Sequence, residues 1–194
     1  MRKHLFAVAA LALFLSAGAA TVRAQEGQAD AKAMEEMMMK LAAPGAPHAH
    51  LAQMAGKFTA RITMYSPGSE PMSSDGTYEG TMELGGRYLL GHFHGSYMGQ
   101  PMEGMSIDGY DNGKQEFFSL WFDNFGTGVF SSTGKLAADG KTVAYHGEMT
   151  MGPMTIPTRE ESTWLDKDTV KFTMWQSMGG QEMKSMEILY TRAK

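Results

Sequence analysis

The chain contains no cysteine. Without cysteine it can form no disulfide, carry no lipid on an N-terminal cysteine, and offer no thiolate to a metal or a substrate. The 194 residues must therefore fold around a hydrophobic core, and a domain of this size buries roughly two thirds of its unfolded surface. We expect a globular domain that folds without covalent cross-links.

Long hydrophobic runs are also missing, except at the N-terminus. There, a basic start at residues 2–4 precedes an apolar run over 5–20 and small residues at 22–24. This order is typical of a signal peptide cleaved before Gln25. The run is shorter than the ~20 residues that span a membrane. We expect residues 1–24 to be a signal peptide, and the protein to be periplasmic or secreted with no stable membrane insertion after cleavage; a retained anchor is the alternative.

Basic residues are scarce. The whole chain has a net charge of −4, and removal of Arg2, Lys3 and Arg23 would bring it to about −7. Binding to nucleic acid or to an anionic membrane requires a basic surface. We therefore expect no nucleic-acid partner.

Motifs of common enzymes are absent from the sequence. Residues 104–108 come close to Gly-x-Ser-x-Gly, but they lie in a predicted strand that no helix follows. His146-Gly147-Glu148 matches part of a zinc deaminase motif, whose cysteines are missing. No His-Glu-x-x-His, phosphate loop or dinucleotide fingerprint occurs. The sequence favours a non-catalytic role, with an enzyme of unknown reaction as an alternative.

Helical patterns occur only before residue 56. Residues 31–43 are rich in helix-forming side chains, and apolar residues recur there at helical spacing: Met34, Met37, Met38 and Leu41. Pro44, Gly45 and Pro47 end this helix. We expect residues 25–47 to form a polar leader, a short helix and a linker. A further helical turn over 48–55 leads into the next domain, whose open end the segment would cover.

From Gly56 to Arg192 the chain alternates between strand-like runs and turn pairs such as Gly85-Gly86 and Asp139-Gly140. Such a pattern predicts an all-β fold. Ten strands are predicted, at 56–65, 76–84, 87–97, 102–110, 115–123, 126–136, 142–150, 155–165, 169–177 and 181–192. Ten antiparallel strands joined by tight turns close into an up-and-down barrel wide enough for one small ligand. We expect residues 48–194 to form this single barrel, with a two-sheet sandwich as the alternative.

Several blocks of sequence resemble a known bacterial family. They are Leu84-Gly85-Gly86-Arg87-Tyr88-Leu89, Gly109-Tyr110-Asp111-Asn112, Trp121-Phe122-Asp123 with Gly126-Thr127-Gly128, and Glu187-Ile188-Leu189-Tyr190-Thr191-Arg192. Together they resemble the domain of unknown function 1579, over about residues 47–192. The resemblance implies a calycin-like barrel, related in shape to lipocalins and fatty-acid-binding proteins, and implies no activity.

The lipocalin likeness also implies a latch. Barrels of that type often carry Gly-x-Trp on the first strand, and an arginine from the end of the last strand covers the tryptophan ring. Gly56-Lys57-Phe58 and Arg192 stand at those places here. A cation is held more weakly over phenylalanine than over tryptophan, so this latch would act mainly through packing.

Aromatic and charged residues on the predicted strands are candidates for a ligand site. We expect Tyr88, His92, Trp121, Tyr145 and Arg159 to line or gate a cavity for a small, largely apolar or amphipathic molecule. An inward Arg159 would have to pair with a ligand carboxylate, because a buried charge is costly. Alternatively, Arg159, Glu161 and Thr163 form a solvated face.

A metal or haem is an alternative content of the barrel. His92 and His94 share one strand face and could bind a metal or a haem iron. The chain has 19 methionines, whose thioethers suit Cu(I). Because methionine is also an adaptable filler of irregular apolar space, we predict no cofactor and keep copper and haem as alternatives. Which of these sites forms depends on which face of each strand points into the barrel, since a one-residue slip in the pairing exchanges the two faces.

Overall fold

The computed structural model describes residues 28 and 30–194, so the predicted signal peptide lies outside the described residues. The chain forms two units, residues 1–43 and residues 44–194. In the first unit, residues 30–42 form a helix where the composition predicts one. Its large apolar side chains are exposed: Met34, Met37, Met38, Met39 and Leu41. No helix among the described residues is both long and apolar enough to cross a membrane.

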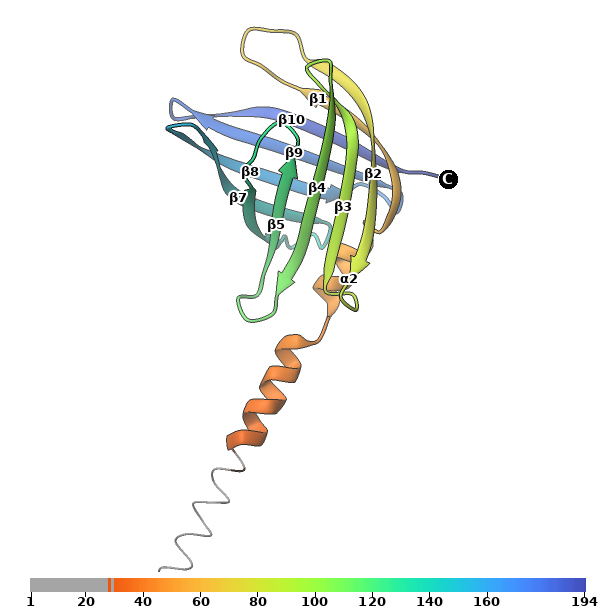
Figure 1. Cartoon of the computed structure of the whole chain (residues 1–194), viewed down its shortest axis with the longest axis vertical. Coiled ribbons are helices and arrows are strands. Elements are labelled where there is room, and N and C mark those ends of the chain that lie inside the picture. Colours follow the sequence, from red (N-terminus) through yellow and green to blue (C-terminus); the bar gives the residue numbers. More distant parts are fainter. Residues whose placement is uncertain (1–27, 29) are drawn as a thin grey trace, which may run out of the picture. The chain divides into compact units, whose positions relative to one another are not determined.

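The second unit is a closed barrel of ten antiparallel strands preceded by one short helix (Figure 1). The helix is α2 (Ala46–Ala52), and the strands are β1 (Gly56–Met64), β2 (Met72–Glu83), β3 (Tyr88–Tyr97), β4 (Gln100–Asp111), β5 (Glu116–Asp123), β6 (Phe130–Leu136), β7 (Thr142–Met151), β8 (Met154–Trp164), β9 (Thr169–Met178) and β10 (Gln181–Arg192). The predicted ten-stranded up-and-down barrel is confirmed.

Each strand pairs with its neighbours in sequence, and β1 pairs with β10 to close the sheet. That last pairing runs from Phe58 opposite Arg192 to Met64 opposite Met186. Every strand therefore has two hydrogen-bonded neighbours, and the barrel has no open sheet edge.

Side chains alternate between the inside and the outside along each strand. In β1, Phe58, Ala60 and Ile62 are buried, whereas Lys57 and Thr59 are exposed. Near α2 the inward side chains fill the barrel with two apolar clusters. One consists of Phe58, Tyr78, Trp164 and Val170, and the other of Leu51, Leu89, Phe117, Val143 and Tyr145.

Helix α2 closes this end of the barrel. Its Leu51 is buried in the cluster around Leu89 and Phe117. The N-terminus of α2 is capped, because Nδ1 of the buried His48 accepts a hydrogen bond of 3.0 Å from the Gly45 N–H. A turn of helix thus covers the barrel end, but it begins at Ala46, within the predicted linker, and ends at Ala52 rather than at residue 55.

The latch implied by the lipocalin likeness is present. The Arg192 guanidinium lies 4.6 Å from the centre of the Phe58 ring. It also donates hydrogen bonds to two carbonyl oxygens that follow α2, of 3.0 Å to Ala55 and 2.6 Å to Gln53. Arg192 therefore joins the end of β10 to the start of β1 and to the segment that leaves α2.

Replacing Arg192→Ala should lower the free energy of unfolding by about 1–2 kcal/mol, because the ring contact is lost and two carbonyls lose their donor. Chemical denaturation measures this. The control is Arg61→Ala, which removes an exposed ion pair with Asp75 and should cost under about 0.5 kcal/mol. Equal losses in the two variants would contradict a stabilising latch.

Candidate functional site

Polar side chains form a belt around the inside of the barrel. The strand register places Asp108 of β4 opposite Ser119, and Ser119 opposite Ser132. Ser132 then lies opposite Gly147, Gly147 opposite Thr158, and Thr158 opposite Gln176. Opposite residues on neighbouring strands lie about 5 Å apart. We call Asp108, Ser119, Ser132, Thr158 and Gln176 the polar belt.

Asp108 is held in the belt by two serines. The Ser106 hydroxyl donates a hydrogen bond of 2.8 Å to Oδ2 of Asp108, and the Ser119 hydroxyl forms a second bond. Burial raises the pKa of Asp108 above its usual range. The side chain nevertheless keeps part of its accessible surface, as expected of a deep residue that lines an internal space.

Glu160 is the second inward carboxyl group. It follows Thr158 on the same face of β8 and is only 4% exposed. The Ser132 hydroxyl donates a hydrogen bond of 3.0 Å to its Oε2. Burial, with a further contribution from the charge of Asp108, raises the pKa of Glu160 to about 7. The charge of Asp108 therefore reaches Glu160.

Three tyrosines face the same region. Burial raises the pKa of Tyr78, Tyr145 and Tyr190, and the charge of Asp108 acts on all three in the same direction. Their hydroxyls therefore stay protonated. We call Asp108, Glu160, Tyr78, Tyr145 and Tyr190 the acidic site.

Gly91 of β3 makes room for this arrangement. A Cβ atom there would lie 2.6 Å from Oγ of Ser106 and 2.7 Å from the hydroxyl of Tyr78. The absence of a side chain lets Tyr78 reach across β3 to hydrogen-bond with Ser106.

Within the part of the chain that the structure describes, the acidic site has no counter-charge. The pKa values of Asp108 and Glu160 are influenced by burial, by serine hydroxyls and, for Glu160, by Asp108; no lysine, arginine or histidine contributes. In addition, Oγ1 of Thr158, a residue only 4% exposed, has no hydrogen-bond partner in the described structure. Buried charges and buried polar atoms normally have partners, because leaving them unpaired costs free energy.

One inward cluster of apolar side chains is not fully buried. Trp121, Phe172 and Met186 belong to the inward cluster around the buried Phe93, yet they are only half-buried. The Trp121 indole N–H donates a hydrogen bond of 2.8 Å to Oδ2 of Asp123, which holds the ring in place. These inward side chains therefore keep accessible apolar surface inside the barrel.

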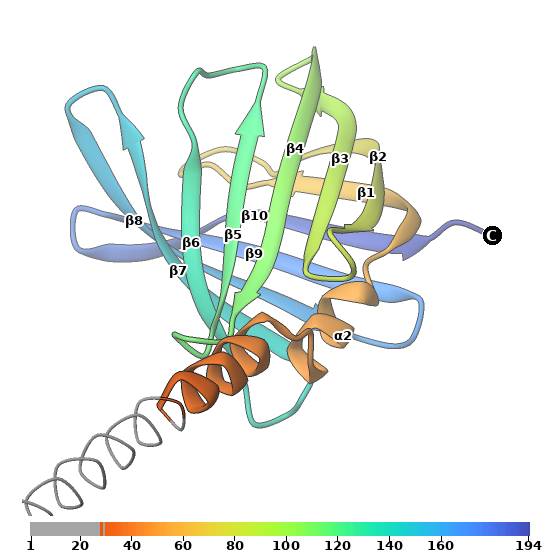
Figure 2. The ribbon, with the colours of Figure 1, turned by 60° about the horizontal axis from the view of Figure 1, so that its bottom comes forward.

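Exposed apolar residues surround the end of the barrel opposite α2. Figure 2 shows the β3–β4 and β7–β8 hairpins at that end. The exposed residues there, which we call the methionine rim, are Met72, Met98, Phe125, Val129, Met151, Met154 and Met178. Exposed apolar groups in one place commonly mark a site of interaction.

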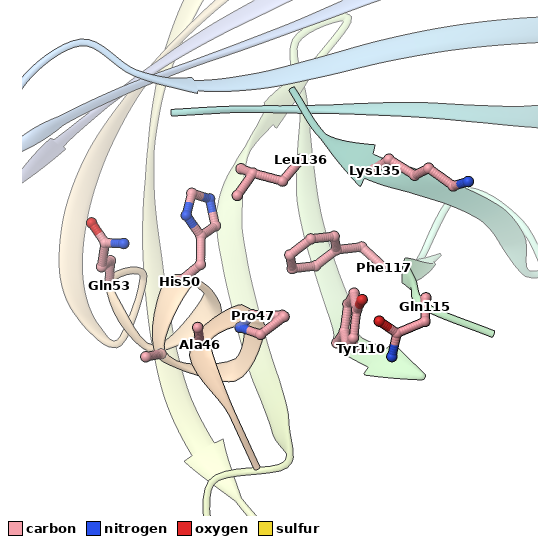
Figure 3. A pocket seen from close by; sticks show the side chains of 10 residues that line it. Ala46, Pro47, His50, Gln53, Tyr110, Gln115, Phe117, Lys135 and Leu136 are labelled. Carbon is pink, nitrogen blue, oxygen red and sulfur yellow. The ribbon is translucent and has the colours of Figure 1, made fainter. Parts of the chain in front are cut away.

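A separate cleft of about 530 Å³ lies at the other end, between α2 and strands β4 to β6 (Figure 3). Its walls include Pro47, His50, Tyr110, Phe117 and Lys135. Burial lowers the pKa of His50. None of the cleft's ten lining residues is a carboxylate or a buried polar group without a partner. The chemistry therefore favours the interior as the functional site.

Two of the five candidates from the sequence face the interior. Trp121 lies above the belt, and Tyr145 belongs to the acidic site. Whether they bind a ligand stays a prediction.

The other three candidates lie on the outer face, and this corrects their expected place on the cavity wall. Tyr88 packs against Phe118 outside the barrel, and His92 is exposed between the buried Gly91 and Phe93. Arg159 lies 3.7 Å above the Trp175 ring and forms ion pairs of 2.6 Å with Glu161 and 2.9 Å with Glu182. On β3 and β8 the inward residues are the immediate neighbours of these three, because successive side chains of a strand point to opposite faces.

The metal alternative gains no support from this geometry. His92 and His94 share a face, as expected, but that face is the exposed one. Among the described residues, no group of three or more His, Cys, Asp or Glu side chains could hold a metal ion.

The sequence reasoning missed Asp108 and Glu160. Arg159, Glu160 and Glu161 are consecutive, so either parity of β8 places a charge inside the barrel. The buried Ile156 and Trp164 share the parity of Glu160. Because large apolar side chains usually point inward, these two residues could have predicted the inward position of Glu160 from the sequence.

Comparison with known proteins agrees with this architecture. Residues 43–192 match the model of a family described as a protein of unknown function, DUF1579. The chain belongs to this family. A comparison of this DUF1579 protein with curated proteins found no match.

Two solved structures share its fold. The crystal structure of Rv2717c from M. tuberculosis has a TM-score of 0.57 and 10% identity, covering 78% of this chain and all of that one. The S-type phycobiliprotein lyase CPES from Guillardia theta has a TM-score of 0.54 and 7% identity, covering 77% of this chain and 94% of that one. At such low identity the likeness is one of fold.

Glu160 should make the stability depend on pH. Its pKa is about 7 in the folded protein, against 4.5 for the free group, so the folded state binds more protons than the unfolded state between these values. The free energy of unfolding should therefore fall as pH rises through this window. Glu160→Gln should reduce that fall, with Asp108 contributing the remainder, and should be more stable than the wild type at pH 8 by about 1–3 kcal/mol.

Chemical denaturation at pH 5 and pH 8 measures this effect. Glu161→Gln, the outward neighbour on β8, is the matched control and should keep the wild-type difference between the two pH values. If Glu160→Gln also keeps that difference, Glu160 is not the titrating group.

Proposed function

We propose that this DUF1579 protein is an exported barrel that binds a small, largely apolar molecule in its interior without chemically changing it. The observation that carries the proposal is the set of inward apolar side chains that remain half-buried inside the barrel, among them Trp121, Phe172 and Met186. A packed core would bury them fully. A ligand in that space would complete their burial.

The methionine rim supports the same function. It surrounds the end that α2 leaves open, where a ligand would enter. Thioether side chains are flexible and adapt to apolar guests of varied shape. The likeness in fold to a phycobiliprotein lyase is in keeping with a barrel that binds a small molecule.

Export rests on the N-terminal sequence alone. If residues 1–24 are a signal peptide, the intact mass of the protein recovered outside the cytoplasm should correspond to a chain that begins at Gln25. A full-length mass there, or recovery in the cytoplasm only, would contradict export.

The binding function can be tested with N-phenyl-1-naphthylamine, a neutral probe whose fluorescence rises in apolar surroundings. We expect saturable binding of one probe per chain. Trp121→Ala should weaken it by about 5–30-fold, because the probe would lose apolar contact worth about 1–2 kcal/mol. Phe118→Ala, on the outer face of the same strand, is the matched control and should change binding less than twofold.

Two results would count against the proposal. One is the absence of saturable binding to the wild-type protein. The other is an equal loss of binding in Trp121→Ala and Phe118→Ala, which would place the probe outside the barrel.

A further inference from the structure

We propose that the acidic site receives the protonated amine group of an amphipathic ligand, with Asp108 and Glu160 as its counter-ions. The inference rests on the proposed binding function and adds the chemical class of the ligand. Its starting point is the pair of inward carboxyl groups, which the described chain supplies with serine hydroxyls and no cation. Two buried carboxylates without a positive partner are unfavourable, and a bound cation would remove this cost.

The acceptors in the acidic site match the donors of an ammonium group. A primary ammonium has three N–H donors and no acceptor, and each carboxylate oxygen can accept two hydrogen bonds. Ser106 and Ser119 use part of the capacity of Asp108, and Ser132 uses one position on Oε2 of Glu160. Both carboxyl groups therefore keep free acceptor positions.

Thr158 provides an independent indication of a missing partner. It lies two residues before Glu160 on the inner face of β8 and is 4% exposed, and its Oγ1 has no hydrogen-bond partner among the described residues. A hydroxyl oxygen accepts hydrogen bonds as well as donating them. A donor group bound at Glu160 would therefore find a further acceptor on the same face of β8.

Other head groups fit the acidic site less well. A ligand carboxylate would bring a third negative charge next to Asp108 and Glu160 in a region of low dielectric constant, where like charges repel strongly. An alcohol could donate one neutral hydrogen bond, which is weaker than a charge-assisted bond. The expected order of affinity is therefore amine, then alcohol, then acid.

The rest of the ligand would be apolar. On the rim side of the polar belt, the inner wall carries Trp121 of β5 and Met102 of β4. An alkyl or aromatic body attached to the amine would lie against these side chains. The ligand class is thus an amphipathic amine, oriented with its charge inside the barrel and its apolar part toward the mouth.

The test compares three molecules with the same tail. Dodecylamine, dodecanol and dodecanoate, each below its aggregation concentration, are titrated at pH 8 against the whole protein loaded with N-phenyl-1-naphthylamine. Dodecylamine should displace the probe with at least tenfold higher affinity than dodecanol, and dodecanoate should be weaker than dodecanol. This comparison needs only the wild-type protein.

Two variants then test whether the preference for the amine depends on Asp108 and Glu160. Asp108→Asn and Glu160→Gln keep the side-chain shape while removing a negative charge, and each should weaken dodecylamine binding at least tenfold while dodecanol binding changes less than threefold. Glu161→Gln, which removes the next charge on the outer face of β8, should leave all three affinities unchanged. Far-ultraviolet circular dichroism checks that each variant is folded.

The outcomes separate this inference from the proposed function. If dodecanol or dodecanoate binds as tightly as dodecylamine, or if the two variants keep the preference for the amine, the acidic site is not an amine receptor, while the barrel remains a binder of apolar molecules. If neither the probe nor any of the three molecules binds, both the inference and the proposed function fail.

Discussion

The structure depends on the pairing of β1 with β10. Seven consecutive residues, from Phe58 to Met64, pair with the last strand, and this contact turns an open ten-stranded sheet into a barrel with an inside and an outside. The Arg192 latch lies at the α2 end of the same seam, where it joins the two strands to the segment after α2. Without closure, the inward face would be one side of a sheet, and the acidic site would have no opposite wall.

Closure divides the interior into three levels with different chemistry. Near α2, apolar side chains such as Phe58, Phe117 and Val170 are almost fully buried and supply the stabilising core. In the middle, the acidic site contains two carboxyl groups, of Asp108 and Glu160, whose burial opposes folding when they are charged. Toward the rim, methionine and aromatic side chains remain accessible. A stable base thus supports a middle level that is unfavourable without a partner, a combination common at functional sites.

Local sequence signals were sufficient for the strands and their order. Turn pairs such as Gly85-Gly86 and Gly179-Gly180 lie between strands as predicted, and the family blocks agree with the barrel. The same signals could not assign the faces. On β5 both faces are apolar, because Phe118 and Phe122 cover the outside while Phe117 and Trp121 lie inside. Hydrophobic alternation therefore carried no information about parity there. The consecutive charges on β8 carried none either, and only the shared parity of Ile156 and Trp164 indicated the inward face of that strand.

The sequence by itself determined that the chain forms ten short strands in a meander, because alternation and turn formation depend on residues close together in the chain. The tertiary structure decided which face of each strand is inside. It placed Asp108 in line with Ser119, Ser132 and Thr158, and it left Tyr88, His92 and Arg159 outside. These outcomes depend on the register between strands and on closure by β1 and β10. Both are contacts between distant parts of the chain, which no local pattern of residues encodes.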